Sequence, residues 1–364
     1  MTNSELKTPP EGPDTGPPLS EGPRSRAGLD VCAIIVSYGD RSDFLNQIVV
    51  RLIESDVKHI LVVFNGNDAT QLSTLHPSII PLAIADNLGS SGGYLAGIES
   101  ALKLDVGYFI LLDDDNLPEP DCLMRLFATH TRLGGSPLLA LQAFRPAQPW
   151  QRVVVRSGVM TIGRKNTYGW FNLANERHLL WRQLGLDAQD TESKSKAAIA
   201  PVQIGVAAYG GLFIRREALE LGERPDPRYF CYYDDLDFTN RLVRRGVTIH
   251  LCADAVINDL DLSWHARTER THPAFSRNTA DQRIYLDLRN AFIFYRSQMT
   301  NRALYLLNGI GFWLGICYLA IFRSTDVDTT RRRLALIRQA VRHGSRGEFA
   351  EPDVWQTKSL TSPT

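Results

Sequence analysis

Short apolar runs separated by amphipathic stretches dominate the chain from residue 31 onward. The runs are continuous, which is typical of strands buried on both faces of a parallel sheet. Helices are predicted between them at residues 44–54, where apolar residues form one stripe, and at 94–104. The pattern predicts an α/β fold with a doubly wound, mostly parallel sheet, whose ligands bind at the carboxyl ends of its strands. The predicted strands occupy residues 31–36, 59–64, 79–84 and 108–112.

The second half of the chain gives weaker signals. Apolar character returns at residues 202–214, ahead of an acidic segment. A following helix is predicted to end at Gly246, because glycine is favoured just beyond helix ends. The elements expected in this half are strands at 153–162, a helix at 176–186, a polar loop at 187–196, a helix at 236–245 and a strand at 247–251.

Composition divides the chain into three parts. Residues 1–28 are dominated by Pro, Gly, Ser, Glu and Thr, and we expect a disordered tail because such a segment buries too little apolar surface to fold. Residues 29–300 form the α/β domain. Residues 301–364 form a C-terminal helical segment and tail, which we expect to associate with a membrane.

The membrane expectation rests on residues 303–322, which carry no charge and are long enough to cross a bilayer as a helix. A basic segment follows, and anionic lipid attracts such segments. The alternative is a buried core helix followed by a solvated basic helix. The basic residues are Arg331, Arg332, Arg333, Arg338, Arg342 and Arg346.

Net charge and cysteine spacing limit the kinds of partner, metal site and cross-link that the chain can have. The chain balances 40 basic against 40 acidic residues, so its net charge does not suggest nucleic acid as a partner. Its five cysteines include no CxxC pair, which argues against zinc and against a disulfide framework. The N-terminus lacks the apolar core of a secretory signal, so we expect a cytoplasmic protein at the inner membrane. The oligomeric state stays open.

Three adjacent carboxylates, Asp113, Asp114 and Asp115, follow the predicted strand at 108–112. Because like charges at one strand end repel one another, a divalent cation would stabilise them, and oxygen ligands suit Mg²⁺ or Mn²⁺. Side chains alternate along an extended segment, so Asp113 and Asp115 should point one way and Asp114 the other. We expect Asp115 to bind metal directly. The alternative is a solvated acidic turn ahead of Pro118.

A second acidic cluster, Asp234, Asp235 and Asp237, follows the aromatic run at 229–233. Partial desolvation beside aromatic rings raises the pKa of a carboxyl group, as a general base requires, and we assign this role to Asp235. Capping of a helix N-terminus is the alternative and explains one of the acids. Trp170 has two interpretations: it stacks on the ring of a ligand, or it belongs to the core.

Residues 86–93 are rich in glycine and join a predicted strand to a helix, where backbone N–H groups can bind a diphosphate. The segment matches neither the dinucleotide fingerprint nor the P-loop. His265 follows the late strand and is a further candidate metal ligand.

Together these motifs resemble the inverting glycosyltransferases of family 2 with the GT-A fold. More narrowly they resemble bacterial galactofuranosyl- and rhamnosyltransferases that build cell-surface polysaccharides. The resemblance covers residues 31–300. The motifs are the opening strand at 34–38, Asn65-Gly66-Asn67, the segment 87–93, Leu112-Asp113-Asp114-Asp115, residues 233–238 and His265.

The resemblance implies transfer of a sugar, galactofuranose or rhamnose, from a UDP- or dTDP-sugar to a hydroxyl of a glycan or lipid-linked acceptor. It implies that Asp235 is the catalytic base. It also implies that Asp113, Asp115 and His265 hold Mg²⁺ or Mn²⁺. Acceptor binding is expected at Trp170, Tyr233 and Asp234. Donor binding is expected at Ser37, Tyr38, Asn65, Asn87, Gly92, Gly93, Asp113 and Asp114.

Two positions depart from the family pattern. Asn65 stands where many relatives carry an aspartate that contacts the nucleotide base, and Ser90-Ser91 stand where relatives often have Gly-Ala. Two other functions stay open at this point. A sugar-1-phosphate nucleotidyltransferase shares the architecture, although Ser37-Tyr38-Gly39-Asp40 lacks the basic glycine-rich loop of that class. A non-catalytic, sugar-nucleotide-binding subunit is the second alternative.

Overall fold

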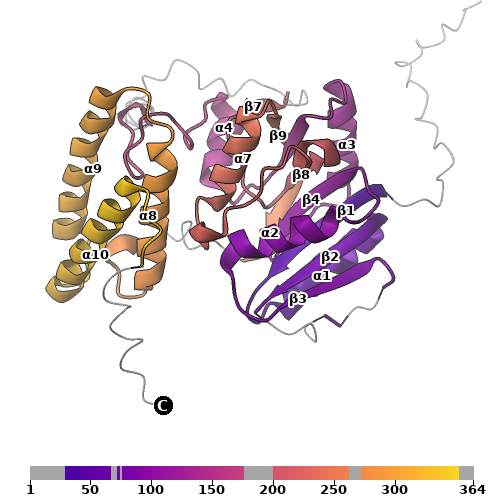
Figure 1. The fold of residues 1–364 in the computed structure, drawn as a ribbon, viewed down its shortest axis with the longest axis horizontal. Helices are drawn as coiled ribbons and strands as arrows, with labels where there is room; N and C mark the ends of the chain where they lie inside the picture. Colours follow the sequence, from indigo (N-terminus) through magenta and orange to yellow (C-terminus); the bar gives the residue numbers. More distant parts are fainter. Residues whose placement is uncertain (1–28, 67–71, 74–75, 176–199, 262–271, 352–364) are drawn as a thin grey trace, which may run out of the picture.

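The computed structural model describes residues 29–66, 72–73, 76–175, 200–261 and 272–351 (Figure 1). Several predictions fall outside these residues: the tail at 1–28, the helix at 176–186, the polar loop at 187–196 and the candidate ligand His265.

The N-terminal half of the sheet is parallel and matches the four predicted strands. β1 is its central strand, and it pairs in parallel with β2 on one side and β4 on the other, while β2 pairs in parallel with β3. The strand ends that follow the apolar runs therefore meet at one edge of the sheet. The strands are β1 (Leu29–Ser37), β2 (Val57–Asn65), β3 (Ile79–Ile84) and β4 (Tyr108–Asp113).

The C-terminal half of the nine-stranded sheet is mixed. β8 lies antiparallel between β4 and β6, and β6 is parallel to β9. The mostly parallel sheet is confirmed, but the insertion of β8 between two parallel strands was not predicted. These strands are β6 (Leu139–Phe144), β8 (Leu212–Arg215) and β9 (Thr248–Asp259), with β5 (Asn116–Pro118) and β7 (Val202–Ile204) antiparallel on β9.

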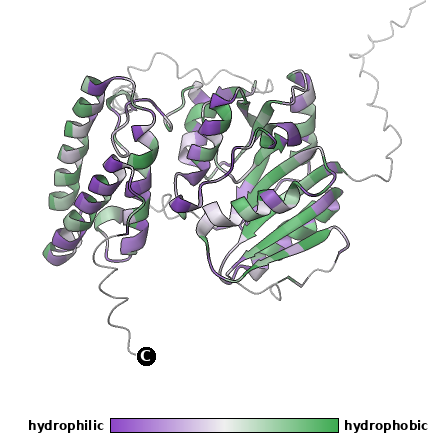
Figure 2. Ribbon diagram, in the orientation of Figure 1, coloured by the Kyte–Doolittle hydropathy of each residue, from purple (hydrophilic) through white to green (hydrophobic). Residues whose placement is uncertain are grey.

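Successive strand residues point to opposite faces of the sheet, so a continuous apolar run makes both faces apolar. Helices cover both of these faces. Ile34 belongs to the core on one face and Ile35 to the core on the other. Figure 2 shows the strands coloured mainly as hydrophobic, as expected for a sheet buried on both sides. One face packs against α1 (Ser42–Glu54) and α3 (Cys122–Arg132), and the other against α2 (Gly89–Ala101), α4 (Pro149–Ser157), α6 (Arg216–Leu219) and α7 (Asp234–Arg244).

The prediction of strands at residues 153–162 was wrong, because α4 occupies the first part of this segment. Its run of three valines favours a strand locally, but Pro149 begins a helix and Gly158 ends it in a left-handed conformation with φ of 67°. Packing of Val154 into the core then overrides the β preference of the valines. Helix α2 also begins earlier than predicted, at Gly89.

Three helices form a bundle beside the sheet domain (Figure 1). α8 packs along α10, and an aromatic core that includes Phe292 and Phe312 joins α8 to α9. This bundle begins with α8, ahead of the boundary expected at residue 301. Its helices are α8 (Asp281–Arg296), α9 (Arg302–Phe322) and α10 (Val327–Arg346).

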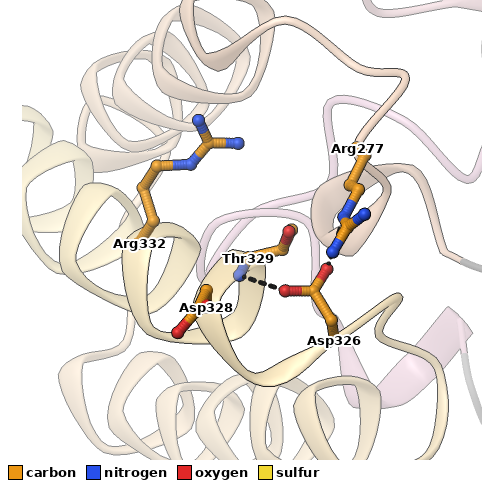
Figure 3. A pocket seen from close by; sticks show the side chains of 5 residues that line it. All are labelled: Arg277, Asp326, Asp328, Thr329 and Arg332. Carbon is orange, nitrogen blue, oxygen red and sulfur yellow. Dashed lines mark hydrogen bonds and ion pairs between the residues drawn. The ribbon is translucent and has the colours of Figure 1, made fainter.

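The start of α10 is fixed by an acidic cap. Asp326 accepts a hydrogen bond from the Thr329 N–H at 2.9 Å and pairs with Arg277 at 2.7 Å, beside a hollow of about 440 Å³ (Figure 3). Further along the helix, Arg333 is fully buried and pairs with Asp281 at 2.5 Å. Arg333 is therefore accessible neither to lipid nor to solvent, and the basic segment expected from residue 331 onward is corrected at this position.

Helix α9 has two distinct faces. Its inward residues, which include Asn308, Phe312 and Ile316, are buried against the rest of the bundle. Its outward side carries exposed apolar residues spaced three and four apart, so α9 is neither a fully buried core helix nor a helix free of protein contacts. By length and composition it is the one described helix that could cross a membrane. The exposed apolar residues of α9 include Leu307, Ile310, Leu314, Tyr318 and Ile321.

Candidate active site

A cavity of about 850 Å³ opens where β1, β2 and β4 end. The start of α2, the segment leading into α7, and α8 complete its walls. This is the edge of the sheet at which the fold class places ligands. Eight of the residues proposed from sequence line the cavity together: Tyr38, Asn65, Asn87, Asp113, Asp114, Tyr233, Asp234 and Asp235.

Five proposed residues with described positions lie outside this lining. Ser37 and Asp115 lie behind it, next to residues that do line it. Gly92 and Gly93 are buried at the start of α2, where they allow close packing against Leu88 and Val36 respectively. The fifth, Trp170, packs on Phe312 of the helical bundle with ring centroids 5.4 Å apart but is 36% exposed, so it lies on the surface of the bundle and belongs neither to the cavity lining nor to the buried core.

The acidic triplet divides between two environments. Asp113 accepts a hydrogen bond from the Tyr94 hydroxyl at 2.8 Å. Asp114 accepts one from the backbone N–H of Tyr38 at 3.1 Å, on the side of β1, and burial raises its pKa to about 6. Asp115 accepts one from the Asn116 amide at 2.8 Å. The triplet is thus held by the fold and is not a solvated turn.

Two asparagines join the ends of β2 and β3 to α2. The Asn65 amide donates to the Asn87 side-chain oxygen at 3.2 Å and to the Gly89 carbonyl at 2.9 Å. Its oxygen accepts the backbone N–H of Leu88 at 2.9 Å. The Asn65 side chain is therefore bonded to the protein at both ends, which fixes the floor of the cavity between β2 and α2.

The segment before α7 is strained. Phe230, Tyr232 and Tyr233 have φ values of 67°, 66° and 63°, a region that aromatic residues rarely adopt. Phe230 is the centre of a three-residue turn, closed by the Cys231 N–H donating to the Tyr229 carbonyl at 2.9 Å. Such strain persists only where the surroundings enforce it, and it is common at functional sites.

Helix α2 is one of the elements that hold this segment. The Ser90 hydroxyl donates to the Asp234 carboxylate at 2.8 Å, and the Ser91 N–H donates to the Phe230 carbonyl at 3.1 Å. Gly89, with φ of 70°, lies directly against that carbonyl, where a Cβ would collide with it. The two serines that depart from the family pattern thus connect the glycine-rich segment to the second acidic cluster.

Asp235 lies on the cavity wall at the first turn of α7. It accepts a hydrogen bond from the Leu236 N–H at 2.8 Å. Burial raises its pKa to about 7, which outweighs the lowering by this bond. A carboxylate with a pKa near neutral pH, facing a cavity, is suited to take a proton from a substrate hydroxyl.

Comparison with known proteins gives the enzyme class. No protein-family model matches the chain. It is 27% identical over 235 residues to galactofuranosyltransferase GlfT1 of Mycolicibacterium smegmatis, across 62% of this chain and 69% of that protein. The chain is a glycosyltransferase homologous to this enzyme. This similarity confirms the expected resemblance to bacterial galactofuranosyltransferases.

Other similarities are more distant. The glycosyltransferase is 26% identical over 213 residues to galactofuranosyltransferase GlfT2 of Mycobacterium tuberculosis, and it spans only 30% of that protein's length. Among solved structures, S. aureus TarS 1–349 aligns with a TM-score of 0.44 and 10% identity, over 88% of this chain and 83% of that one. The complex of TarS 1–349 with UDP aligns with a TM-score of 0.45 and 9% identity, over 88% of each chain.

The structure adds a residue of the glycosyltransferase that the sequence analysis missed. Arg145 is buried at the end of β6 and lines the cavity. Its guanidinium donates to Asp259 at 2.7 Å and to Asp113 at 3.3 Å. Burial opposes its charge, but Asp113 and Asp259 outweigh this effect and raise its pKa. The sequence carried one signal for Arg145, because it directly follows the apolar run of β6 and the ends of strands meet at this edge of the sheet.

The side chains of the acidic triplet are carboxylates, the type of ligand that Mg²⁺ and Mn²⁺ prefer. Burial and then the Asp113 charge raise the pKa of Asp115 to about 7, so the two carboxylates are close enough to repel each other. Mg²⁺ commonly binds one or two carboxylates together with substrate phosphates and water. Within the described ranges no group of three metal-binding side chains occurs, and the expected third ligand, His265, lies outside them.

Proposed function

We propose that the enzyme transfers galactofuranose or rhamnose from a UDP- or dTDP-sugar to a hydroxyl of a glycan or lipid-linked acceptor in cell-surface polysaccharide synthesis. The observation that carries the proposal is the shared cavity of Asp113 and Asp235. One carboxylate lies at the sheet edge, where a diphosphate is expected, and the other is a base with a pKa near 7. The names of the two homologues favour galactofuranose.

The reaction is a single displacement. Asp235 removes the proton of the acceptor hydroxyl as the hydroxyl oxygen forms a bond to the anomeric carbon of the donor sugar. The bond between that carbon and the diphosphate oxygen breaks, and the nucleoside diphosphate leaves. Because the acceptor attacks from the side opposite to the leaving group, the anomeric configuration inverts.

Charge on the leaving diphosphate must be balanced. Arg145 supplies one buried positive charge at the sheet edge, fixed by Asp113 and Asp259. Asp113 and Asp115 would hold Mg²⁺ or Mn²⁺, which would stabilise the negative charge that develops on the diphosphate. The Tyr94 hydroxyl keeps Asp113 oriented through its 2.8 Å hydrogen bond.

Membrane association forms the second part of the proposal. The outward apolar stripe of α9 suits the interface of a bilayer, with the helix lying along the surface while its inner face stays in the bundle. Arg302 and Arg323 flank the helix and suit anionic headgroups. In this proposal the enzyme works at the cytoplasmic face of the membrane, beside lipid-linked acceptors.

The donor assignment is tested by calorimetry with purified enzyme, Mg²⁺ or Mn²⁺, and a panel of nucleotide sugars. Binding of one UDP- or dTDP-sugar that disappears in EDTA supports both the enzyme class and the metal, and it names the donor. Binding that is unchanged in EDTA contradicts the proposed metal requirement but leaves the enzyme class supported. Folded enzyme that binds no member of the panel would contradict the proposed function.

A further inference from the structure

A carboxylate from the helical bundle faces the same cavity. Asp287 on α8 lines it together with Gln282 and Arg283 from the preceding turn. Asn290, three residues further along α8, donates to the backbone of the segment that leads into α7. Residues three and four apart share one helix face, so Arg283, Asp287 and Asn290 form a stripe directed at the cavity and its strained wall.

Asp287 differs from the other acids of the cavity in its partners. Asp113, Asp114, Asp234 and Asp235 each accept a hydrogen bond from a named protein donor. Among the described residues, no donor or cation pairs with the Asp287 carboxylate. Burial alone raises its pKa to about 7, with no opposing group to lower it.

Asp287 is half-buried and faces the cavity, so a ligand that enters the cavity can supply the hydrogen bonds that its carboxylate does not receive from the described protein residues. The surroundings indicate which ligand. Phe230, Tyr232 and Tyr233 line the same cavity, and aromatic surfaces suit the apolar C–H faces of a sugar ring. Carboxylates accept hydrogen bonds from sugar hydroxyls but repel phosphate unless a cation lies beside them. Arg145 lies beside Asp113, whereas no described cation pairs with Asp287. The anionic donor diphosphate is therefore expected beside Arg145 and a neutral polyol beside Asp287.

We propose that Asp287 is an acceptor-binding residue that accepts hydrogen bonds from hydroxyls on the terminal sugar of the acceptor. It holds the ring on the aromatic wall so that the attacking hydroxyl faces Asp235. This inference rests on the proposed glycosyl transfer. It also assigns a role in specificity to α8, the first helix of the bundle, at which the sequence indicated no candidate site residue.

The test compares the wild type with Asp287→Asn, using the donor found by calorimetry and a soluble glycan acceptor. Losing a charged acceptor of hydrogen bonds should raise the acceptor KM by about 10- to 100-fold. Donor Kd and donor hydrolysis without acceptor should stay within about twofold of the wild type, because Asp287 lies away from the expected diphosphate site. Asp43→Asn, an exposed carboxylate of α1, is the matched control and should change neither.

Two further variants keep the inference testable if Asp287→Asn folds poorly. Asp287→Glu retains the charge and should recover part of the acceptor affinity. Gln282→Ala alters an exposed residue at the rim of the cavity and should raise the acceptor KM by a smaller factor. An unchanged acceptor KM in folded Asp287→Asn overturns the inference, as does a fall confined to kcat at saturating acceptor.

The same experiment separates the two proposals. Wild-type enzyme that neither binds nor hydrolyses any nucleotide sugar contradicts the proposed function itself. Wild-type enzyme that transfers sugar while folded Asp287→Asn matches it in acceptor KM contradicts only the role of Asp287.

Discussion

The side-chain amide of Asn290 donates a hydrogen bond to the backbone carbonyl of Cys231 at 2.7 Å. The same amide lies within hydrogen-bonding distance of the Tyr229 and Tyr232 carbonyls, at 2.9 Å and 3.1 Å. One side chain of α8 therefore holds the strained segment that leads into Asp234 and Asp235. The helical bundle is part of the active-site scaffold and not an appended anchor.

Replacing Asn290 with alanine should release this segment. Each buried hydrogen bond contributes about 1 kcal/mol, and unpaired buried carbonyls add to the loss, so we expect a lower melting temperature and turnover reduced at least about tenfold. Donor affinity should change little, because the hydrogen bonds of Asn290 to described residues go to Arg289 and to the segment before α7, and not to the sheet edge. Thermal unfolding, calorimetry and initial rates measure the three quantities. Full turnover in Asn290→Ala would contradict the scaffold role.

Replacing Asp235 with asparagine should reduce turnover by a factor of at least about 100, because the amide cannot take the acceptor proton. Donor affinity should be largely retained, since the amide has nearly the same shape. Initial rates at saturating donor and acceptor, together with calorimetry, make the measurement. Near-wild-type turnover would show that another group is the base.

The pH profile should carry the signature of Asp235. Burial raises its pKa to about 7, so the carboxylate form that acts as base is populated above this value. We therefore expect kcat/KM to rise with pH through an apparent pKa near 7 and to level off above it. In Asp235→Asn, kcat at saturating acceptor should lack this rise. In the same variant, kcat/KM for the acceptor should keep the part that Asp287 contributes, because burial raises the pKa of Asp287 to about 7 as well. A profile that is flat between about pH 5 and 8 in the wild type would contradict the assignment.

Gly89 offers a test of the contact between α2 and the strained segment. Gly89→Ala places a Cβ against the Phe230 carbonyl at a residue with φ of 70°. Gly135→Ala is the matched control, because its φ of 62° is similar and no atom lies within 4 Å of the added Cβ. Backbone strain of about 1 kcal/mol is expected in both, and further loss of stability and of turnover only in Gly89→Ala. Equal melting temperatures and rates in the two variants would contradict the contact.

The outward face of α9 can be altered without disturbing its buried face. Serine at Leu307, Ile310 and Leu314, which are 50%, 61% and 66% exposed, should lower the fraction of enzyme that sediments with anionic vesicles. The melting temperature should stay close to that of the wild type, because these side chains do not pack in the core.

A matched triple variant carries serine at Val50, Met124 and Leu133, exposed apolar residues of the sheet domain and its loops. This control should sediment like the wild type. Identical sedimentation of both triple variants and the wild type would show that α9 does not contribute to membrane binding.

The sequence by itself determined the elements and site residues whose signals are local. Strands buried on both faces appear as continuous apolar runs, and β1 to β4 lie where those runs predict. The two acidic clusters stand out because carboxylates at a strand end and beside aromatic residues are recognisable without knowledge of their neighbours. The misassigned valines of α4 show the limit of such local patterns, since packing decided that segment.

Only the tertiary structure decided the partners of these residues. Ser90 and Asp234 are 144 positions apart, and their hydrogen bond exists because α2 and α7 pack on the same face of the sheet. Arg145 reaches Asp113 because β6 joins the sheet through the antiparallel β8. Asp287 faces the cavity only because the helical bundle docks beside it. Such long-range contacts depend on packing between elements, which no local pattern of apolar and polar residues encodes.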